Sequence, residues 1–372
     1  MNEPDIYIGI MSGTSIDCVD AVAVTFSDGK INIIGSHSES ISAQLKLDIL
    51  CLCEPGTDSI ALYAETDNIL GELFARAALN LMTQLDIKPS QVAAIGSHGQ
   101  TVRHQPPTKV NGFSLQIGNP NLIAARTKCA VVADFRRADM ALGGQGAPLV
   151  PAFHQRFFHA ENSHRVIINI GGIANVTLLG GKDQCSGFDT GPGNMLLDAW
   201  CFKHKAQIYD DKGAWAATGN ISKPLLNRLK KHPFFSMEAP KSTGREDFNL
   251  LWLEQQPGAL SLKPEDVQAT LTALTAETIA DAIADLTQSF DDIFVCGGGV
   301  FNTQLINHLN QSLCESHQSA VKSTLDIGLD PKWVEACAFA WLAGRRIENK
   351  TGNLPAVTGA SQPAVLGGLY LP

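Results

Sequence analysis

Short runs of apolar, often β-branched residues, separated by small-residue turns, dominate the start of each half of the chain. Such runs are typical of β-strands, and a glycine- or serine-rich turn between two of them is typical of a β-hairpin. Each half therefore opens with a predicted strand, a small-residue turn (12–17 in the first half, 171–172 in the second) and another strand. The predicted strands are residues 7–11, 19–26, 31–36, 165–170 and 173–179.

Apolar residues with helical spacing follow these hairpins. Residues 60–85 show this spacing and precede a short buried strand at 92–95. In the second half a helix continues through 196–202, and a later long helix leads into a strand at 292–296 and a helix from about Asn302. The apolar face of the long helix comprises Leu271, Leu274, Thr278, Ala282, Ile283 and Leu286.

This alternation predicts an α/β protein with two domains, each a mixed sheet flanked by helices, and a cleft between them. A chain of 372 residues is also long for a single core. The expected domains are residues 1–134 with about 355–372, and residues 135–354, with boundaries uncertain by about 15 residues. The glycine- and proline-rich stretch 143–151 is expected to be a loop near the point where the chain crosses between them.

Composition and charge limit which partners and which cellular location can be expected. The formal net charge of -9 argues against a nucleic-acid partner, because an acidic surface repels phosphate backbones. The first residues lack the basic and apolar regions of a signal peptide, and no apolar run reaches the ~20 residues needed to cross a bilayer. The nine cysteines are scattered, and only Cys51 and Cys53 are close, at a spacing unusual for zinc or redox sites. We therefore expect a cytoplasmic protein with reduced thiols and no membrane partner.

The first turn, SGTSIDCVD, is a candidate nucleotide-binding segment. Small residues let backbone N–H groups approach a phosphate, and hydroxyl groups add further donors. Asp17 and Asp20 are candidate magnesium ligands that act through water molecules. There is no Walker lysine, so the segment is not a P-loop, and a plain hairpin with aspartate in its turn is the alternative. The candidates are Ser12, Gly13, Thr14, Ser15, Ile16, Asp17, Cys18, Val19 and Asp20.

Two later glycine-rich turns are candidates for the same nucleotide. NIGGIAN (169–175) has the design of the first turn and could hold the other side of a triphosphate. VCGGGVFN (295–302) places a glycine triplet between a strand and a helix, where a flat ring or a phosphate can approach closely. Tight structural turns are the alternative for both. The candidates are Asn169, Gly171, Gly172, Asn175, Gly297, Gly298 and Gly299.

The motif FDTGPGN (188–194) carries the candidate base. We expect Asp189 at the end of a strand, on a glycine-rich turn, where a carboxylate can take a proton from a hydroxyl group or a water molecule. The alternative is an aspartate that caps a helix or stabilises the turn.

Two polar stretches are candidates for sugar contacts. SHGQT (97–101) follows a buried strand, and the alternative is a loop in which His98 binds backbone groups. In DFRRAD (134–139), Arg136 or Arg137 could hold a carboxylate with two hydrogen bonds, and the alternative is a surface ion-pair cluster. The sugar candidates are His98, Gln100, Thr101, Arg136 and Asp139.

The order of these segments resembles that of the actin, hexokinase and Hsp70 superfamily. More narrowly, MSGTSIDCVD, GSHGQT, DFRRADMALGGQGAPLVPAFH, NIGGIANVT, FDTGPGN and VCGGGVFN resemble the anhydro-N-acetylmuramic acid kinase family. The similarity runs from residue 8 to the TGASQPAVLGGLYLP ending, which is nearly the whole chain. It implies two actin-like (ribonuclease H-like) domains.

The resemblance also implies a reaction. Such enzymes use ATP and water to open the 1,6-anhydro ring of 1,6-anhydro-N-acetylmuramic acid and to phosphorylate O6, in cell-wall recycling. It implies that residues 13–20 bind the ATP phosphates with Mg²⁺ and that Asp189 is the base. It further implies that Glu335, in WVEACAFAWLA, is a second active-site acid, and that the protein is a homodimer. A kinase for another amino sugar or hexose, or an ATP-driven switch like actin or Hsp70, are the alternatives.

One position departs from the family pattern. The family usually reads SGTSxDGxD, and this chain has Cys18 at the second glycine. If the position needs a positive φ, cysteine strains the loop by ~1 kcal/mol or more. If it needs only a small side chain, cysteine fits.

Overall fold

The computed structural model describes residues 5–27, 29–54, 56–106, 112–181, 184–285, 290–314 and 320–372. The chain divides into two compact units, Met1–Phe157 with Trp333–Pro372 (unit 1) and Phe158–Lys332 (unit 2). The boundaries expected near 134/135 and 354/355 both fall inside unit 1 in this division. Within the described ranges, no helix is both long and apolar enough to cross a membrane.

Unit 1 is built on a six-stranded mixed sheet in the order β3-β2-β1-β4-β7-β13. β1, β2 and β3 are antiparallel, whereas β4 and β7 run parallel to β1. The strands are β1 (Ile6–Met11), β2 (Cys18–Ser27), β3 (Lys30–Ser40), β4 (Val92–Ser97), β7 (Val131–Ala133) and β13 (Gly368–Tyr370), with a separate hairpin β5 (Gln100–Gln105) and β6 (Phe113–Ile117). The helices are α1 (Ala43–Cys53), α2 (Ile60–Gln84), α3 (Pro120–Thr127), α4 (Arg137–Ala141), α5 (Pro151–Phe158), α11 (Val334–Ile347) and α12 (Pro355–Thr358).

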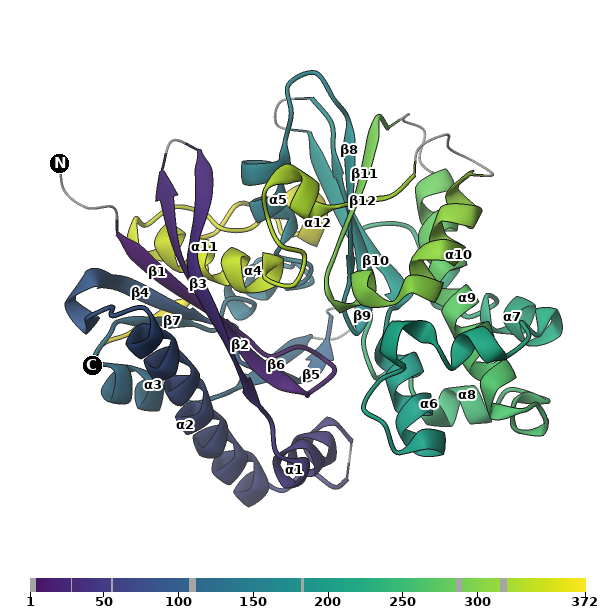
Figure 1. The fold of residues 1–372 in the computed structure, drawn as a ribbon. Helices are drawn as coiled ribbons and strands as arrows, with labels where there is room; N and C mark the ends of the chain where they lie inside the picture. The colour runs from purple at the N-terminus through teal and green to yellow at the C-terminus, as the bar shows by residue number, and fades with distance from the viewer. Residues whose placement is uncertain are drawn as a thin grey trace. The chain divides into compact units, whose positions relative to one another are not determined.

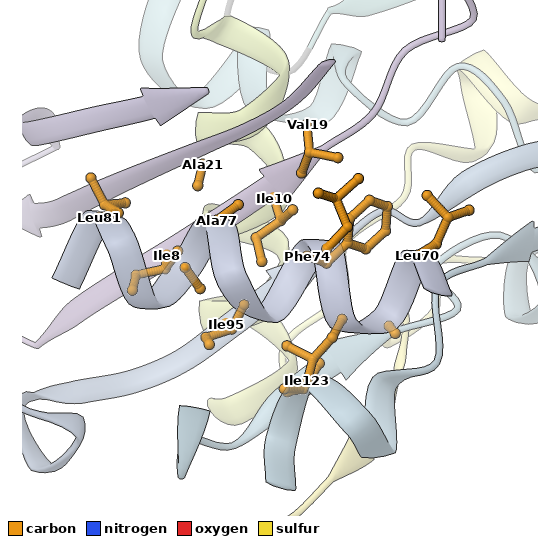
Figure 2. Packing of buried hydrophobic residues seen from close by; sticks show 14 of the residues in the cluster. Ile8, Ile10, Val19, Ala21, Leu70, Phe74, Ala77, Leu81, Ile95 and Ile123 are labelled. Carbon is orange, nitrogen blue, oxygen red and sulfur yellow. The ribbon is translucent and has the colours of Figure 1, made fainter. Parts of the chain in front are cut away.

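Helix α2 covers one face of this sheet (Figure 1). Ser59 caps the helix by accepting a hydrogen bond from the backbone N–H of Leu62, and one stripe of apolar residues then faces the strands. Figure 2 shows this stripe packed on alternate residues of β1 and β2. The labelled side chains are Ile8, Ile10, Val19, Ala21, Leu70, Phe74, Ala77, Leu81, Ile95 and Ile123.

Helix α11 packs on the opposite face, against β1 and β4. Two glycines make this approach possible. A Cβ atom on Gly9 would lie 1.8 Å from the carbonyl oxygen of Ala336, and one on Gly96 would lie 2.0 Å from that of Phe339. Gly344, later in the helix, lies beside Tyr7, earlier in β1, so the helix runs antiparallel to the strand. The first turn of α11 therefore lies towards the end of β1 that leads into the turn 12–17.

Unit 2 repeats the same sheet plan. Its five strands are ordered β10-β9-β8-β11-β12, with β8, β9 and β10 antiparallel and with β11 and β12 parallel to β8. The strands are β8 (Arg165–Ile170), β9 (Ile173–Leu179), β10 (Cys185–Pro192), β11 (Asp292–Cys296) and β12 (Lys322–Ser323). The helices are α6 (Met195–Lys205), α7 (Lys223–Leu229), α8 (Leu250–Glu254), α9 (Pro264–Ala284) and α10 (Thr303–Cys314).

Helices α9 and α10 pack on the same face of this sheet. Alternate strand residues such as Ile168 and Val176 point into their core, so the intervening residues point to the other face. Two α/β units with mixed sheets and flanking helices confirm the predicted fold class, and the strands of the two sheets follow the same order.

Most predicted elements are confirmed within a few residues, from β1 and β2 to α9 and α10. Leu286, predicted on the face of the long helix, lies outside the described residues. The expectation that Asp189 ends a strand was wrong. Asp189 lies inside β10, and the pairing with β9 shifts register only after it, where Gly191 has a φ of 136°. The glycines of FDTGPGN thus bend a strand that continues to Pro192.

Candidate active site

The turn 12–17 joins β1 to β2 and contains one strained residue. Ile16 has a φ of 53°, in the left-handed region that β-branched residues rarely adopt, and its side chain is fully buried. Burial and the hydrogen bond from Ile16 N–H to the Gly13 carbonyl (3.2 Å) hold this conformation. A Cβ atom on Gly13 would meet nothing closer than Ser15 Oγ at 3.9 Å. The backbone beside Gly13 is therefore open to a ligand.

The carboxylates of Asp17 and Asp20 are both held by hydroxyl groups. Ser15 Oγ donates to Asp17 Oδ1 (2.6 Å), and the Cys18 N–H donates to the same oxygen (3.0 Å). Ser38 Oγ donates to Asp20 Oδ1 (2.6 Å). Among the described residues, no three His, Cys, Asp or Glu side chains form a metal-binding group. Two partly exposed carboxylates nevertheless fit Mg²⁺, which keeps several water molecules and binds one or two carboxylates plus phosphates.

The backbone at Cys18 is not strained by a positive φ. It begins β2, pairs with Ser40 of β3 and is absent from the residues with positive φ. Its thiol donates to Asp20 Oδ1 (3.6 Å). The position thus requires only a side chain of modest size, and cysteine fits.

We therefore expect Cys18→Gly to leave the KM for ATP nearly unchanged. The variant should lose about 0.5–1 kcal/mol of stability, because glycine weakens a strand. Steady-state kinetics and urea denaturation measure the two effects. A large loss of ATP use in a folded variant would instead give the thiol a role of its own.

Lys46 is a cation beside this turn that the sequence did not reveal. It lies on α1 and donates from Nζ to the carbonyl oxygen of Ser15 (2.8 Å). The predicted nucleotide turn lacks a Walker lysine in sequence, yet the fold places a lysine next to it. No local pattern marks Lys46, because the contact joins segments 31 residues apart.

The polar stretch after β4 is tied to the first turn. Ser12 Oγ donates to Gln100 Oε1 (2.7 Å), and the His98 N–H donates to the Ile10 carbonyl (3.0 Å). Gln116 Nε2 donates to Thr101 Oγ1 (3.2 Å). These contacts place the predicted nucleotide turn and the predicted sugar stretch at the same end of the unit 1 sheet.

His98 connects this stretch to Arg136. Its Nδ1 bonds the carbonyl of Gly99 (2.8 Å), and its Nε2 accepts from Arg136 Nη2 (2.9 Å). Burial, with the Arg136 guanidinium nearby, holds the pKa of His98 well below its usual value. A neutral His98 therefore orients Arg136 rather than transferring protons, which agrees with the alternative of a histidine that binds backbone.

The other charged residues of DFRRAD serve the fold. Arg137 forms an ion pair with Asp134 (2.6 Å) on the surface. Asp139 is fully buried and accepts hydrogen bonds from Asn353 Nδ2 (2.6 Å) and Thr358 Oγ1 (2.7 Å). A further bond, from the Gly146 N–H, fixes the glycine-rich loop (2.9 Å). Asp139 thus joins this loop to the C-terminal segment.

Glu335 lies in the first turn of α11. The close contact of the next residue, Ala336, with Gly9 places this turn against β1. Because the helix runs antiparallel to β1, Glu335 lies at the end of the strand that enters the turn 12–17.

In unit 2, four polar residues form a row across the sheet. Asp189 of β10 pairs with Asn175 of β9, which pairs with Asn169 of β8, which in turn pairs with Cys296 of β11. Directly paired residues point to the same face, here the face opposite α9 and α10. Asn175 Oδ1 is buried and has no hydrogen-bond partner in the described part of the chain. The row unites the predicted base with both asparagines of the second glycine turn.

The glycines of the two later turns have different tasks. The carbonyls of Gly171 and Gly172 accept hydrogen bonds from the backbone N–H groups of residues 193–195, at 2.8–3.2 Å. Cβ atoms on Gly297 and Gly299 would clash with Ile170 at 2.7 and 2.4 Å. Gly298 is exposed, and a Cβ atom added there would lie no closer than 3.7 Å to another residue, at Asn194 Nδ2. Within the triplet, Gly298 is therefore the position that can approach a ligand.

A segment that sequence reasoning missed holds Asp189. The Asp189 N–H donates to the Lys241 carbonyl (3.1 Å), and the Thr243 N–H donates to Asp189 Oδ2 (3.0 Å). The polar run KSTGR (241–245), between apolar stretches, is the signal that could have identified it. Asp189 is 5% exposed, so its carboxylate is largely shielded from bulk water.

Comparison with known proteins shows the family of this chain. A family model described as anhydro-N-acetylmuramic acid kinase matches residues 5–372. Anhydro-N-acetylmuramic acid kinase from a Shewanella species (strain MR-7) is 52% identical over 366 residues, covering 98% of each chain. The protein of that name from Shewanella denitrificans is 52% identical over 372 residues, covering 100% of this chain and 99% of the relative.

Similarity to solved structures is more remote. Component A of the (R)-2-hydroxyglutaryl-CoA dehydratase of Acidaminococcus fermentans aligns with a TM-score of 0.47 at 11% identity, covering 92% of this chain and 99% of that one. The close sequence relatives and the family match both extend over essentially the entire chain. This chain therefore belongs to the anhydro-N-acetylmuramic acid kinase family.

Proposed function

We propose that this protein is an ATP-dependent kinase that opens 1,6-anhydro-N-acetylmuramic acid and phosphorylates O6. The products are N-acetylmuramic acid 6-phosphate and ADP, and the role is peptidoglycan recycling. The observation that carries the proposal is the polar row Asp189–Asn175–Asn169, which brings a shielded carboxylate beside a glycine turn in a chain of this family.

In the proposed reaction, Asp189 takes a proton from a water molecule. The water oxygen bonds to the anomeric carbon of the sugar, and the C1–O6 bond breaks with its electron pair moving to O6. The O6 oxygen then attacks the γ-phosphorus of ATP, and ADP leaves. Glu335 lies beside the nucleotide turn of unit 1 and is the proposed second active-site acid.

The turn 12–20 is the proposed site for the ATP phosphates. Its open backbone at Gly13 and the hydroxyl group of Thr14 would supply donors, and Lys46 supplies positive charge at the Ser15 carbonyl. Asp17 and Asp20 would hold Mg²⁺ through water molecules. Such an ion neutralises the phosphate charge that develops during transfer. Gly171, Gly172 and Gly298 are the proposed phosphate and adenosine contacts of unit 2.

Isotope-labelled water tests the reaction. The protein is incubated with Mg-ATP and the anhydro sugar in H₂¹⁸O, and the masses of the products are measured by mass spectrometry. We expect one ¹⁸O in the sugar phosphate and none in ADP, because water enters at the anomeric carbon. A phosphorylated product without the label, or faster phosphorylation of intact N-acetylmuramic acid, would instead identify a kinase for intact sugars. ATP hydrolysis without any phosphorylated sugar would identify an ATP-driven switch.

Asp17→Asn tests the nucleotide turn. Asparagine can still accept the hydrogen bonds of Ser15 and Cys18, but it lacks the charge that attracts a hydrated metal. We expect Mg-ATP affinity to fall by about 10–100-fold, the range for residues that hold a metal indirectly. Calorimetry measures the binding of Mg-ATP and of sugar separately. Unchanged nucleotide binding, or a selective loss of sugar binding, would show that the turn is misassigned.

A further inference from the structure

Residues 241–248 of unit 2 support Asp189 at the edge of its sheet. β10 is the edge strand of the five-stranded sheet, so the backbone groups on its outer side must find partners outside the sheet. At Asp189 this partner is the Lys241 carbonyl, which accepts a hydrogen bond from the Asp189 N–H (3.1 Å). The Thr243 N–H donates to Asp189 Oδ2 (3.0 Å). The backbone and the carboxylate of Asp189 are therefore both held by residues 241–243.

The side chain of Thr243 is itself held by Asp247. Its hydroxyl group donates to Asp247 Oδ2 (2.6 Å), a length typical of a hydroxyl donor on a carboxylate, which is a stronger bond than one between neutral groups. Thr243 is 5% exposed, so water competes little for this bond. The N–H groups of Asp247 and Phe248 donate to the Gly244 carbonyl (3.3 and 3.2 Å) and close a turn between the two side chains. The Thr243–Asp247 bond thus fixes the turn from which the Thr243 N–H reaches Asp189.

Aromatic packing ties this turn to the bend in β10. Phe248, at the end of the turn, is fully buried and packs on Phe235 and Trp252, with ring centroids 5.5 and 5.2 Å apart. Phe235 lies against Gly191, where an added Cβ atom would come within 2.6 Å of its ring. Gly191 is the bent position two residues after Asp189. The turn and the strand therefore pack on the same rings, and close packing resists movement of one relative to the other.

We propose that Thr243 and Asp247 are positioning residues for Asp189, which fix the direction of the carboxylate that takes a proton from water. The inference rests on the proposed function, in which Asp189 is the base. Both side chains act through the Thr243 N–H and need no contact with the sugar. A base must lie within hydrogen-bond reach of the proton that it takes, and a displacement of ~1 Å can lower the rate by ~100-fold.

The first test is Thr243→Val. Valine keeps the branched shape and the backbone N–H, but it cannot donate to Asp247. We expect kcat to fall by about 10–100-fold while KM for the sugar and for ATP stays unchanged, because the base is misplaced and the substrates still bind. Thr243→Ser keeps the hydroxyl group and should recover most of kcat. Asp247→Ala removes the acceptor and should lower kcat as valine does. Steady-state kinetics of anhydro-sugar consumption measures all three.

A double variant shows whether the effect passes through Asp189. Asp189→Asn already lacks the base, so adding Thr243→Val should lower its residual turnover no further. An equal loss in the wild-type and Asp189→Asn backgrounds would mean that Thr243 acts independently of Asp189, and it would overturn the inference.

Thr270→Val is the matched control. Thr270 is also a buried threonine of unit 2. Its hydroxyl group accepts from the Ser222 N–H (2.9 Å) and donates to the Asp266 carbonyl (2.7 Å), so it links the start of α7 to α9 rather than to Asp189. Its loss should affect stability and leave kcat close to wild type.

Three results decide the inference. A folded Thr243→Val or Asp247→Ala enzyme with wild-type kcat, or with a change in KM alone, overturns it. Failure of both variants to fold overturns it as well, because the pair would then serve stability. Wild-type turnover in Asp189→Asn is a separate result, which refutes the proposed base itself.

Discussion

Asp189→Asn is expected to lower turnover by about 10²–10⁴-fold, the usual contribution of a positioned base. Asparagine has the same shape and can still accept the hydrogen bond from the Thr243 N–H, so the local fold should persist. It cannot take a proton from water. Because O6 is released only when the ring opens, ring opening and phosphorylation should be lost together. Following anhydro-sugar consumption and ADP formation in one assay measures both.

Asp210→Asn is the control for this variant. Asp210 is also a buried aspartate of unit 2 that accepts backbone hydrogen bonds, here from Trp215 (2.8 Å) and Ala216 (2.9 Å). Its replacement should affect stability and leave turnover close to wild type. The assignment of Asp189 fails if Asp189→Asn opens the ring at a normal rate, or if it loses nucleotide binding rather than turnover.

Gly9→Ala is expected to have the largest effect on stability. The added Cβ would lie 1.8 Å from the Ala336 carbonyl oxygen, so α11 must move away from β1. Overpacking of this kind costs about 1–3 kcal/mol, and more where the backbone itself is the obstacle. The movement would also displace Glu335, one residue before Ala336. Urea denaturation should show a lower midpoint, and the folded fraction should have reduced activity.

Gly13→Ala separates crowding within the protein from contact with a ligand. A Cβ at Gly13 meets only Ser15 Oγ at 3.9 Å, and its φ is not in the positive region, so stability should be unchanged. If the nucleotide phosphates approach this backbone, the added methyl group should still weaken ATP binding. A stable Gly9→Ala variant would contradict the close packing of α11. Normal ATP affinity in Gly13→Ala would contradict the nucleotide turn.

The sequence by itself determined the local elements of both units. Strands β1, β2, β8 and β9 and the turns between them follow from β-branched runs and small residues that are neighbours in the chain. The long helices α2 and α9 follow from a spacing contained within each helix. The family resemblance was also visible, because its motifs are contiguous and each can be recognised without knowledge of the fold.

Only the tertiary structure decided which of these residues meet. The row from Asp189 to Asn169 depends on the register of three strands, and the position of Asp189 inside β10 depends on pairing with β9. Lys46 and the backbone carbonyl of Lys241 contact segments that are distant in the chain, at Ser15 and Asp189. Local patterns specify the faces of a strand or helix, but contacts between distant segments depend on how those faces pack, which short-range spacing does not encode.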